Sequence, residues 1–331
     1  MDIADIMSKL DKKTLKRVMA AQDITIEKIP LASYTLNRGL KGGIGKGRQT
    51  LVWGNKSAGK SSLCLESVAA AQKMGQSCAW IDAEASFDPQ WAQQLGVDTS
   101  QLIVSPVKSI GDFTLVGCEL MEAGIDVLVA DSISALLPST YFEKEDEIKE
   151  GLEGTKQIGT VSKELGIAVN KFNYVNKNTA LILISQARNK FNTYGAALKP
   201  MGGESMMYFS STIIKLWSSA SEREQITDEE TYGNRIIKVP IARPVTWTIE
   251  YNKIGPPMQV GNYNFHYQGG FVGVDNIGEI ANMAVDMGII NKGGAWYSYE
   301  DQKFQGERRL IEWLRENPDL QEKLLKEIYD A

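Results

Sequence analysis

The segment Gly54-Asn55-Lys56-Ser57-Ala58-Gly59-Lys60-Ser61 limits the possible folds of this chain more than any other feature. It fits G-x-x-x-x-G-K-[S/T], with a strand-like run before it, Thr50 to Trp53, and a helical pattern from about Ser62. Such a loop turns backbone N–H groups toward phosphates, and the helix N-terminus adds partial positive charge. Lys60 would reach the β- and γ-phosphates, and the Ser61 hydroxyl would bind Mg²⁺. The segment predicts a nucleoside triphosphate site from Gly54 to Ser62; the alternative is a chance match in a glycine-rich loop.

Two acidic residues follow other predicted strands. Asp131 ends the apolar run Val127 to Asp131, where a carboxylate can hold the Mg²⁺ shell. Its alternative role is to cap the next helix. Glu84 follows the run Trp80 to Asp82 and should reach the same sheet edge as the phosphates, as a candidate base for the attacking water. A solvated loop glutamate is the competing interpretation.

Strand-like runs alternate with helical patterns between Gly39 and about Gly261, which predicts an α/β fold with a mostly parallel sheet covered by helices. The expected strands are Thr50 to Trp53, Cys78 to Asp82, Leu102 to Val104, Val127 to Asp131, Leu181 to Gln186 and Thr212 to Trp217. Residues 1–32 should form an appendage, an amphipathic helix followed by an extended stretch at Ile24 to Ile29. We expect the core to span residues 33–262 and a small α/β domain to span residues 263–331.

Composition narrows the classes of function. The chain has 331 residues, 43% of them hydrophobic, enough to bury a large core. It carries 41 acidic against 36 basic residues, so any contact with DNA must come from local patches. No apolar run approaches the ~20 residues that span a bilayer. Its cysteines are odd in number and lie in apolar surroundings, which favours reduced thiols and a cytosolic location. His266 is the sole histidine, which excludes a histidine-based triad.

Several longer segments together are recognisable. They are GRQTLVWGNKSAGKSSLCLESVAAAQKMGQSCAWIDAEASFDPQWAQQLGV, DVLVADSISALLP, ALILISQARNKF and GIINKGGAWYSY. In this order along the chain they resemble the RecA family of ATP-dependent DNA strand-exchange recombinases, and the resemblance extends over nearly the whole length.

The resemblance implies roles around the nucleotide. Glu84 matches the catalytic glutamate of the family, and Asp88 and Trp91 fall where the family contacts adenine and stacks on it. Trp91 replaces the usual tyrosine, and packing in the core is its alternative role. Gln186 matches the glutamine that senses the γ-phosphate and signals to the DNA-binding loop; a strand-end cap is the competing role. ATP and Mg²⁺ are the implied cofactors.

The resemblance also implies two DNA-binding loops. The segment from Arg188 to Gly203 resembles the second loop; its cations could neutralise phosphates, and an aromatic side chain could wedge between bases. Its candidate DNA contacts are Arg188, Lys190, Phe191, Tyr194, Lys199, Gly202 and Gly203. Glu143 to Gly159 corresponds to the first loop, where Ile158 aligns with the apolar wedge of the family and Lys163 with its phosphate contact. A plain surface loop is the alternative there.

Departures from the family pattern affect the contact between subunits. RecA proteins place two lysines near a strand end to reach the ATP of the neighbouring subunit; here Lys253 keeps the second, whereas Tyr251 occupies the first. Lys56 stands where an acidic residue is usual, the stretch Arg223 to Val245 looks longer, and the inhibitory acidic tail is missing. These differences suggest a diverged, phage-encoded relative with weaker restraint on duplex binding.

The sequence as a whole predicts an ATP-dependent recombinase. We expect a head-to-tail helical filament on single-stranded DNA that pairs it with homologous duplex, since an interface that does not close on itself produces such a polymer. No membrane is expected among the partners. One alternative is a hexameric helicase with the same core, against which the C-terminal GAWYSY segment argues. The other is an ATP-regulated annealing or mediator protein, which Tyr251 and the acidic first loop keep open.

Overall fold

The structure is a computed structural model that describes residues 2–15, 18–141, 157–188, 198–219, 221–232 and 235–330 of the chain. A central sheet of eleven strands has the order β13-β12-β11-β9-β3-β7-β6-β4-β5, with β10 beside β11 and β8 beside β7. Its strands are β3 Arg48–Gly54, β4 Cys78–Asp82, β5 Leu102–Pro106, β6 Val127–Asp131, β7 Ala180–Arg188, β8 Lys199–Pro200, β9 Thr212–Trp217, β10 Ile226–Tyr232, β11 Arg235–Asn252, β12 Gln259–His266 and β13 Gly273–Val274.

The middle of this sheet is parallel. Strands β9, β3, β7, β6, β4 and β5 run in one direction, whereas β11, β12 and β13 extend the sheet with antiparallel pairs. Because both faces of the parallel block are covered, β4 and β6 are buried at every position and appear in the sequence as continuous apolar runs. The α/β fold with a mostly parallel sheet is confirmed.

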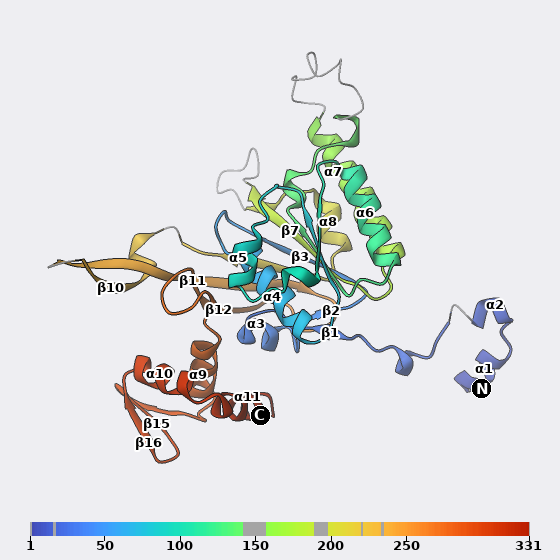
Figure 1. The fold of residues 1–331 in the computed structure, drawn as a ribbon. Coiled ribbons are helices and arrows are strands. Elements are labelled where there is room, and N and C mark those ends of the chain that lie inside the picture. Colours follow the sequence, from blue (N-terminus) through green and yellow to red (C-terminus); the bar gives the residue numbers. More distant parts are fainter. Residues whose placement is uncertain are drawn as a thin grey trace.

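Helices cover both faces of the sheet (Figure 1). Helices α4 (Lys60–Lys73) and α5 (Pro89–Gln94) pack on one face over a core that includes Val52 and Trp80. The opposite face carries α6 (Ile110–Glu122), α7 (Gln157–Val175) and α8 (Glu204–Phe209). Short 3₁₀ turns lie at Thr99–Gln101, Ile133–Ala135, Ser139–Tyr141 and Glu222–Glu224. No helix in the described parts of the chain is long and apolar enough to cross a membrane.

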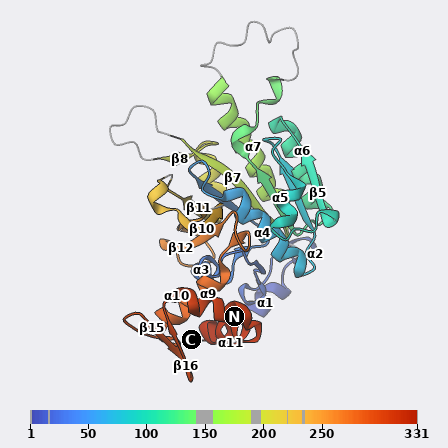
Figure 2. The same cartoon turned by 60° about the vertical axis from the view of Figure 1, so that its left-hand side comes forward.

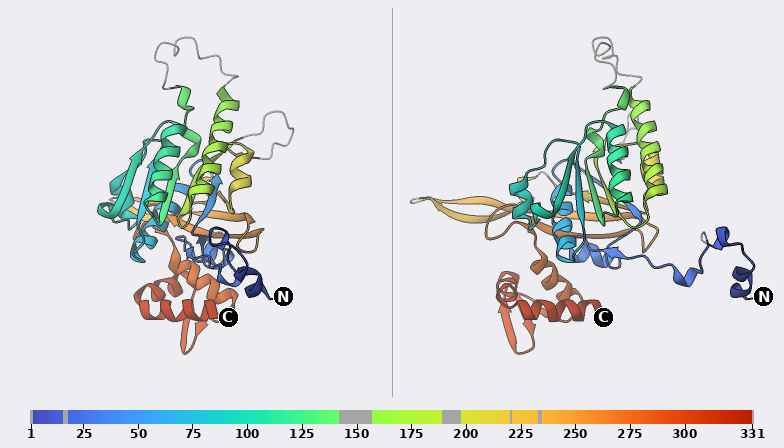
Figure 3. Two further views of the ribbon diagram at one scale, coloured as in Figure 1. Left: turned by 90° about the vertical axis from the view of Figure 1, so that its right-hand side faces the viewer. Right: turned by 45° about the vertical axis from the view of Figure 1, so that its right-hand side comes forward.

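The N-terminal segment is an arm that extends away from the core (Figure 3). We expected a single amphipathic helix here, and that prediction is wrong. The arm contains α1 (Ile3–Ser8), α2 (Lys12–Leu15) and a 3₁₀ turn (Ala21–Asp23). The Asp11 carboxylate accepts hydrogen bonds from the backbone N–H groups of Lys13 and Thr14, at 2.8 and 3.0 Å. A cap of this kind starts a new helix and so interrupts the first. The arm ends at β1 (Lys28–Ile29), which pairs with β2 (Ile44–Gly45).

The C-terminal part has its own core and lies at one end of the main sheet (Figure 2). It contains α9 (Asn276–Asp286), the three-stranded sheet β14 (Asn291–Gly293), β15 (Trp296–Tyr299) and β16 (Gln302–Gln305), and the helices α10 (Glu307–Glu316) and α11 (Pro318–Asp330). The boundary expected between residues 262 and 263 falls inside β12, and the main sheet continues to Val274. We therefore infer that the C-terminal domain begins near Asn276.

Glu279 joins the two domains. Its carboxylate accepts hydrogen bonds from the Ser33 hydroxyl at 2.6 Å and from the backbone N–H of Tyr34 at 2.9 Å. Both partners lie at the start of α3 (Tyr34–Gly39), where a negative charge is favoured by the helix dipole.

The long segment expected from Arg223 to Val245 is a hairpin. Strands β10 and β11 pair from Ile226 with Ala242 to Tyr232 with Arg235, and the hairpin projects from the core on the side opposite the N-terminal arm (Figures 1 and 3).

Candidate nucleotide-binding site

The phosphate-binding loop connects β3 to α4. Gly54 ends β3 so close to β9 that a Cβ atom there would lie 1.8 Å from the backbone oxygen of Leu216. Gly59, at a φ of 79°, adopts the left-handed conformation directly before α4. Both positions therefore require glycine, for close approach and for backbone conformation respectively. Helix α4 starts at Lys60, slightly earlier than the expected Ser62, and its N-terminus faces the loop.

Lys60 folds back over this loop. Its Nζ donates hydrogen bonds to the backbone oxygens of Asn55 at 2.8 Å and Gly54 at 3.3 Å. Burial lowers the pKa of Lys60, and the nearby carboxylates of Asp131 and Glu84 oppose this shift. The ammonium group is thus held at the loop by acceptors that a phosphate could replace.

Asn55 fixes the loop to β9. Its Nδ2 donates to the backbone oxygen of Ser218 at 2.7 Å, and its Oδ1 accepts from the Ser218 N–H at 3.2 Å. The Ser218 hydroxyl in turn donates to the backbone oxygen of Pro244 in β11 at 2.9 Å. The loop, β9 and β11 are therefore connected by side-chain hydrogen bonds.

Asp131 lies at the end of β6, and its carboxyl is buried. Burial raises the pKa of Asp131 to about 6; a hydrogen bond from the Ser61 hydroxyl acts in the opposite direction, and the nearby Glu84 and Asp82 raise it further. A carboxylate beside a hydroxyl offers the oxygen ligands that Mg²⁺ prefers.

Asp82 caps the turn after β4. Its carboxylate accepts hydrogen bonds from the backbone N–H groups of Ser86 and Phe87, both at 3.1 Å.

Glu84 and Gln186 meet across the end of β6. Gln186 donates its Nε2 hydrogen to Glu84 Oε1 at 2.9 Å, and the Ser132 hydroxyl donates to the same oxygen. The backbone N–H of Gln186 donates to the Ser134 hydroxyl at 2.9 Å. Glu84 is exposed but oriented, so it is not merely a solvated loop glutamate.

These groups surround one cavity of about 320 Å³. The structure brings together here residues that sequence analysis had placed in one site. They are Lys56, Ser57, Ala58, Gly59, Lys60, Ser61, Ser62, Glu84, Asp131 and Gln186. Arg243 of β11 also lines the cavity, together with Ser132 and Ile184. Sequence analysis missed Arg243 because it belongs to no local motif and reaches the cavity only through the pairing of β11 with β9.

Comparison with known proteins identifies the family. The model of the RecA N-terminal domain matches residues 1–272, and the model of the RecA C-terminal domain matches residues 278–331. This chain belongs to the RecA family. Protein RecA of Saccharopolyspora erythraea is 32% identical over 98% of this chain and 90% of its own length. Protein RecA of Laribacter hongkongensis is 31% identical over 99% of the chain and 89% of its own length.

Members of the RecA family are DNA recombinases and DNA-dependent ATPases. They bind nucleotide and DNA and assemble into filaments. The match covers both the ATPase core and the C-terminal domain, so the recombinase is favoured over the hexameric helicase.

The other nucleotide-binding candidates lie outside the cavity. Asp88 caps α5, accepting from the Gln90 N–H at 2.8 Å. Trp91 is half-buried against the core. The structure thus shows for Trp91 the core packing that sequence analysis had named as its alternative, and for Asp88 a capping role that sequence analysis had not considered. The contact of both residues with adenine stays a prediction.

Lys253 lies at the start of the segment after β11. Its Nζ is 5.7 Å from the ring centroid of Tyr251 and donates to the backbone oxygen of Tyr208 at 3.4 Å. Tyr251, which we expected at the position of the first family lysine, thus contacts Lys253, which we expected at the second.

The expected DNA-binding residues fall into two groups. Ile158 and Lys163 belong to α7, which begins at Gln157, so the expected first loop ends before residue 159. Lys163 is exposed. At the second loop, Arg188 and Lys199 pair across β7 and β8. The glycines Gly202 and Gly203 have φ of 107° and 87° and precede α8. Lys190, Phe191 and Tyr194 lie outside the described residues.

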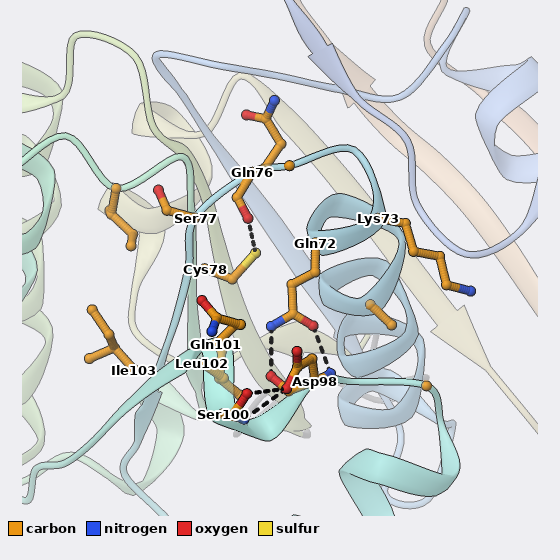
Figure 4. Close-up of a pocket in the computed structure, with 14 residues that line it drawn as sticks. Gln72, Lys73, Gln76, Ser77, Cys78, Asp98, Ser100, Gln101, Leu102 and Ile103 are labelled. Carbon is orange, nitrogen blue, oxygen red and sulfur yellow. Dashed lines mark hydrogen bonds between the residues drawn. The ribbon is translucent and has the colours of Figure 1, made fainter.

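A larger cavity, about 650 Å³, lies at the opposite edge of the sheet, where β4 begins (Figure 4). Gln72 and Asp98 exchange two hydrogen bonds of 2.9 Å across it. Burial raises the pKa of Cys78 to about 12, so its thiol is neutral. The lining of this cavity offers no activated nucleophile, and we assign it no catalytic role.

Proposed function

We propose that this RecA-family protein forms helical filaments on single-stranded DNA and uses ATP and Mg²⁺ to drive homologous pairing and strand exchange. The observation that carries the proposal is the convergence of Lys60, Asp131, Glu84 and Gln186 on one cavity, at the strand end from which the second DNA loop departs.

The residues of the cavity fit a triphosphate with its metal. Gly54 permits close backbone approach, and the start of α4 offers its N–H groups to phosphate oxygens. Lys60 would exchange its carbonyl partners for phosphate oxygens. Ser61 and Asp131 would hold Mg²⁺, which supplies charge neutralisation for phosphoryl transfer. On this proposal Asp88 and Trp91 contact the base.

Glu84 is the proposed base. Its carboxylate is oriented by the Ser132 hydroxyl and the Gln186 amide, and its exposure leaves it open to a water molecule. A carboxylate in hydrogen-bond reach of water can orient and deprotonate it.

Gln186 is the proposed link to DNA. It lies in β7 two positions before Arg188, where the strand ends, so displacement of its side chain would be transmitted to the second loop. We propose that Arg188, Lys199, Gly202 and Gly203 contact the DNA backbone directly or shape the loop that does. Lys190, Phe191, Tyr194, Ile158 and Lys163 are the further candidates.

Self-assembly is proposed to use the N-terminal arm. Its apolar side chains are open in the isolated chain, with Ile3 65% and Met19 64% exposed. Large exposed apolar side chains on an extended arm favour contact with another protein surface. Packing of the arm on the next protomer would give a head-to-tail interface, and Lys253 would then approach the neighbouring nucleotide.

The cytoplasm is the proposed location. The three cysteines, Cys64, Cys78 and Cys118, are free and buried. Free buried thiols agree with a reducing compartment.

Electron microscopy and a strand-exchange assay test the proposal. With ATP, Mg²⁺ and single-stranded DNA, we expect open helical filaments and joint molecules with homologous duplex. Closed six-membered rings would contradict the filament. Filaments that bind single strands but never exchange them would favour the mediator, the alternative suggested by Tyr251.

A further inference from the structure

Arg243 is placed by β11 on the same side of the sheet as α4. Its partner across β12 is Phe265, and cross-strand partners share a face of the sheet. Phe265 and Val245, two positions further along β11, both belong to the core beneath α4. Because alternate residues of a strand point the same way, Arg243 continues this row to the cavity at the start of α4.

The guanidinium of Arg243 has an unused donor. Its Nε is buried without a hydrogen-bond acceptor. Arg243 forms no ion pair with any of the described residues, although Glu84 and Asp131 line the same cavity. Arginine stays charged and carries donors in a fork that matches phosphate oxygens. Arg243 is half-buried, but its Nε is fully buried, and buried donors normally have an acceptor. The missing acceptor points to an anion from outside the chain.

The backbone next to Arg243 is fixed to the phosphate-binding loop. Pro244 accepts from the Ser218 hydroxyl at 2.9 Å, and Ser218 exchanges two hydrogen bonds with Asn55 of the loop. These bonds fix the backbone from which the Arg243 side chain extends, so only the side chain would have to be ordered when a ligand binds.

The sheet order places Arg243 across the cavity from the acidic residues. Strand β3, which carries the loop, lies between β9 and β7; β11 follows β9 on one side, whereas β6 and β4 follow β7 on the other. Asp131 and Glu84 therefore approach the cavity from one side and Arg243 from the other. Phosphates bound at the loop would lie between a metal-binding side and a cationic side.

We propose that the Arg243 guanidinium binds phosphate oxygens of the nucleotide held by the loop of its own subunit. This inference rests on the proposed nucleotide site. It adds a further cation from within the subunit to Lys56 and Lys60, which also line the cavity; Lys253 does not line it.

Calorimetric titration of the full chain in Mg²⁺ tests the proposal, with ATPγS and inorganic tripolyphosphate as ligands. We expect Arg243→Gln to weaken both by about tenfold, which is about 1.4 kcal/mol, and Arg243→Lys to restore part of the loss. Tripolyphosphate lacks base and ribose, so a weaker affinity of Arg243→Gln for tripolyphosphate would locate the contact at the phosphates. Arg235→Gln, an exposed change on the same strand, is the matched control and should bind as wild type does.

Two further measurements separate the outcomes. If Arg243 serves only the fold, Arg243→Gln lowers the unfolding temperature but leaves both affinities within twofold of wild type, and the proposal is overturned. Lys60→Ala tests the site itself. If Lys60→Ala abolishes binding while Arg243→Gln does not, the Arg243 contact alone is wrong; if wild type binds neither ligand, both proposals fail.

Discussion

Gln186 Nε2 lies 2.9 Å from Glu84 Oε1, although the two residues are 102 positions apart in sequence. They come from β7 and from the segment after β4, with β6 between the two strands. The amide therefore bridges the proposed base and the strand that leads into the second DNA loop. On the proposed roles of Glu84 and Gln186, this hydrogen bond would connect ATP hydrolysis to DNA binding.

Replacing Gln186 by alanine should uncouple nucleotide from DNA. We expect ATPγS to bind with near wild-type affinity, because Lys60 and the loop are untouched. The increase in single-strand affinity that ATPγS produces over ADP should be lost. Fluorescence anisotropy of a labelled oligonucleotide measures the single-strand affinity with each nucleotide. Gln302→Ala in the distant β16 is the control. An unchanged ratio of the two DNA affinities would refute the link.

Replacing Glu84 by glutamine should stop turnover but not binding. The amide keeps the size of the side chain and an oxygen for the Ser132 hydroxyl, but it cannot take a proton from water. We expect DNA-dependent ATP hydrolysis to fall by about 10²–10⁴-fold, with ATPγS affinity within a few-fold of wild type. Phosphate release measures the rate of hydrolysis, and calorimetry measures ATPγS affinity. Glu119→Gln on the exposed side of α6 is the control. Wild-type hydrolysis in Glu84→Gln would remove Glu84 from the base role.

Metal binding should depend on the ionisation of Asp131. Burial raises its pKa to about 6, so the carboxyl is mostly neutral at pH 5 and ionised at pH 7.5. Because Mg²⁺ would bind the ionised carboxylate, apparent Mg²⁺ affinity at fixed ADP should fall about tenfold from this group between pH 7.5 and pH 5. Asp131→Asn should bind Mg²⁺ weakly, and its Mg²⁺ affinity should lack the pH dependence that comes from the Asp131 carboxyl. The same pH dependence in both proteins would assign it to the nucleotide instead.

Glu66 should make the fold less stable at high pH. It lies in α4 and accepts from the Val274 N–H at 2.9 Å, and burial raises its pKa to about 8 from 4.5. The folded chain therefore holds a proton that the unfolded chain releases, so the stability contributed by this group is fully present below about pH 4.5 and is lost as pH rises toward 8. Each unit in that window costs at most about 1.4 kcal/mol.

Glutamine at position 66 is neutral at every pH, and its oxygen can still accept from Val274. Glu66→Gln should therefore match wild type near pH 4.5 and exceed its free energy of unfolding by up to about 3 kcal/mol at pH 7. Urea unfolding across this range measures the difference, with exposed Glu322→Gln as control. A difference that does not vary with pH would show that Glu66 is ionised in the fold.

Local patterns predicted much of the core. Cys78–Asp82, Val127–Asp131 and Thr212–Trp217 have the bounds that their apolar runs indicated. The first two are buried at every position, and a strand buried on both faces is mostly apolar. The arm was predicted less well. Its apolar spacing favoured one helix, but the Asp11 cap, which periodicity does not register, divides it. The phage origin of the chain stays a prediction.

The sequence alone determined the phosphate-binding loop, since glycines, a lysine and a helix start within one short segment specify it without distant contacts. It also indicated Asp131 and Glu84 as strand-end acids. Only the tertiary structure decided that Gln186 bonds to Glu84 and that Arg243 enters the cavity, and it placed β12 in the main sheet. These depend on strand order and register, which are set by pairing between segments far apart in the chain and leave no local pattern.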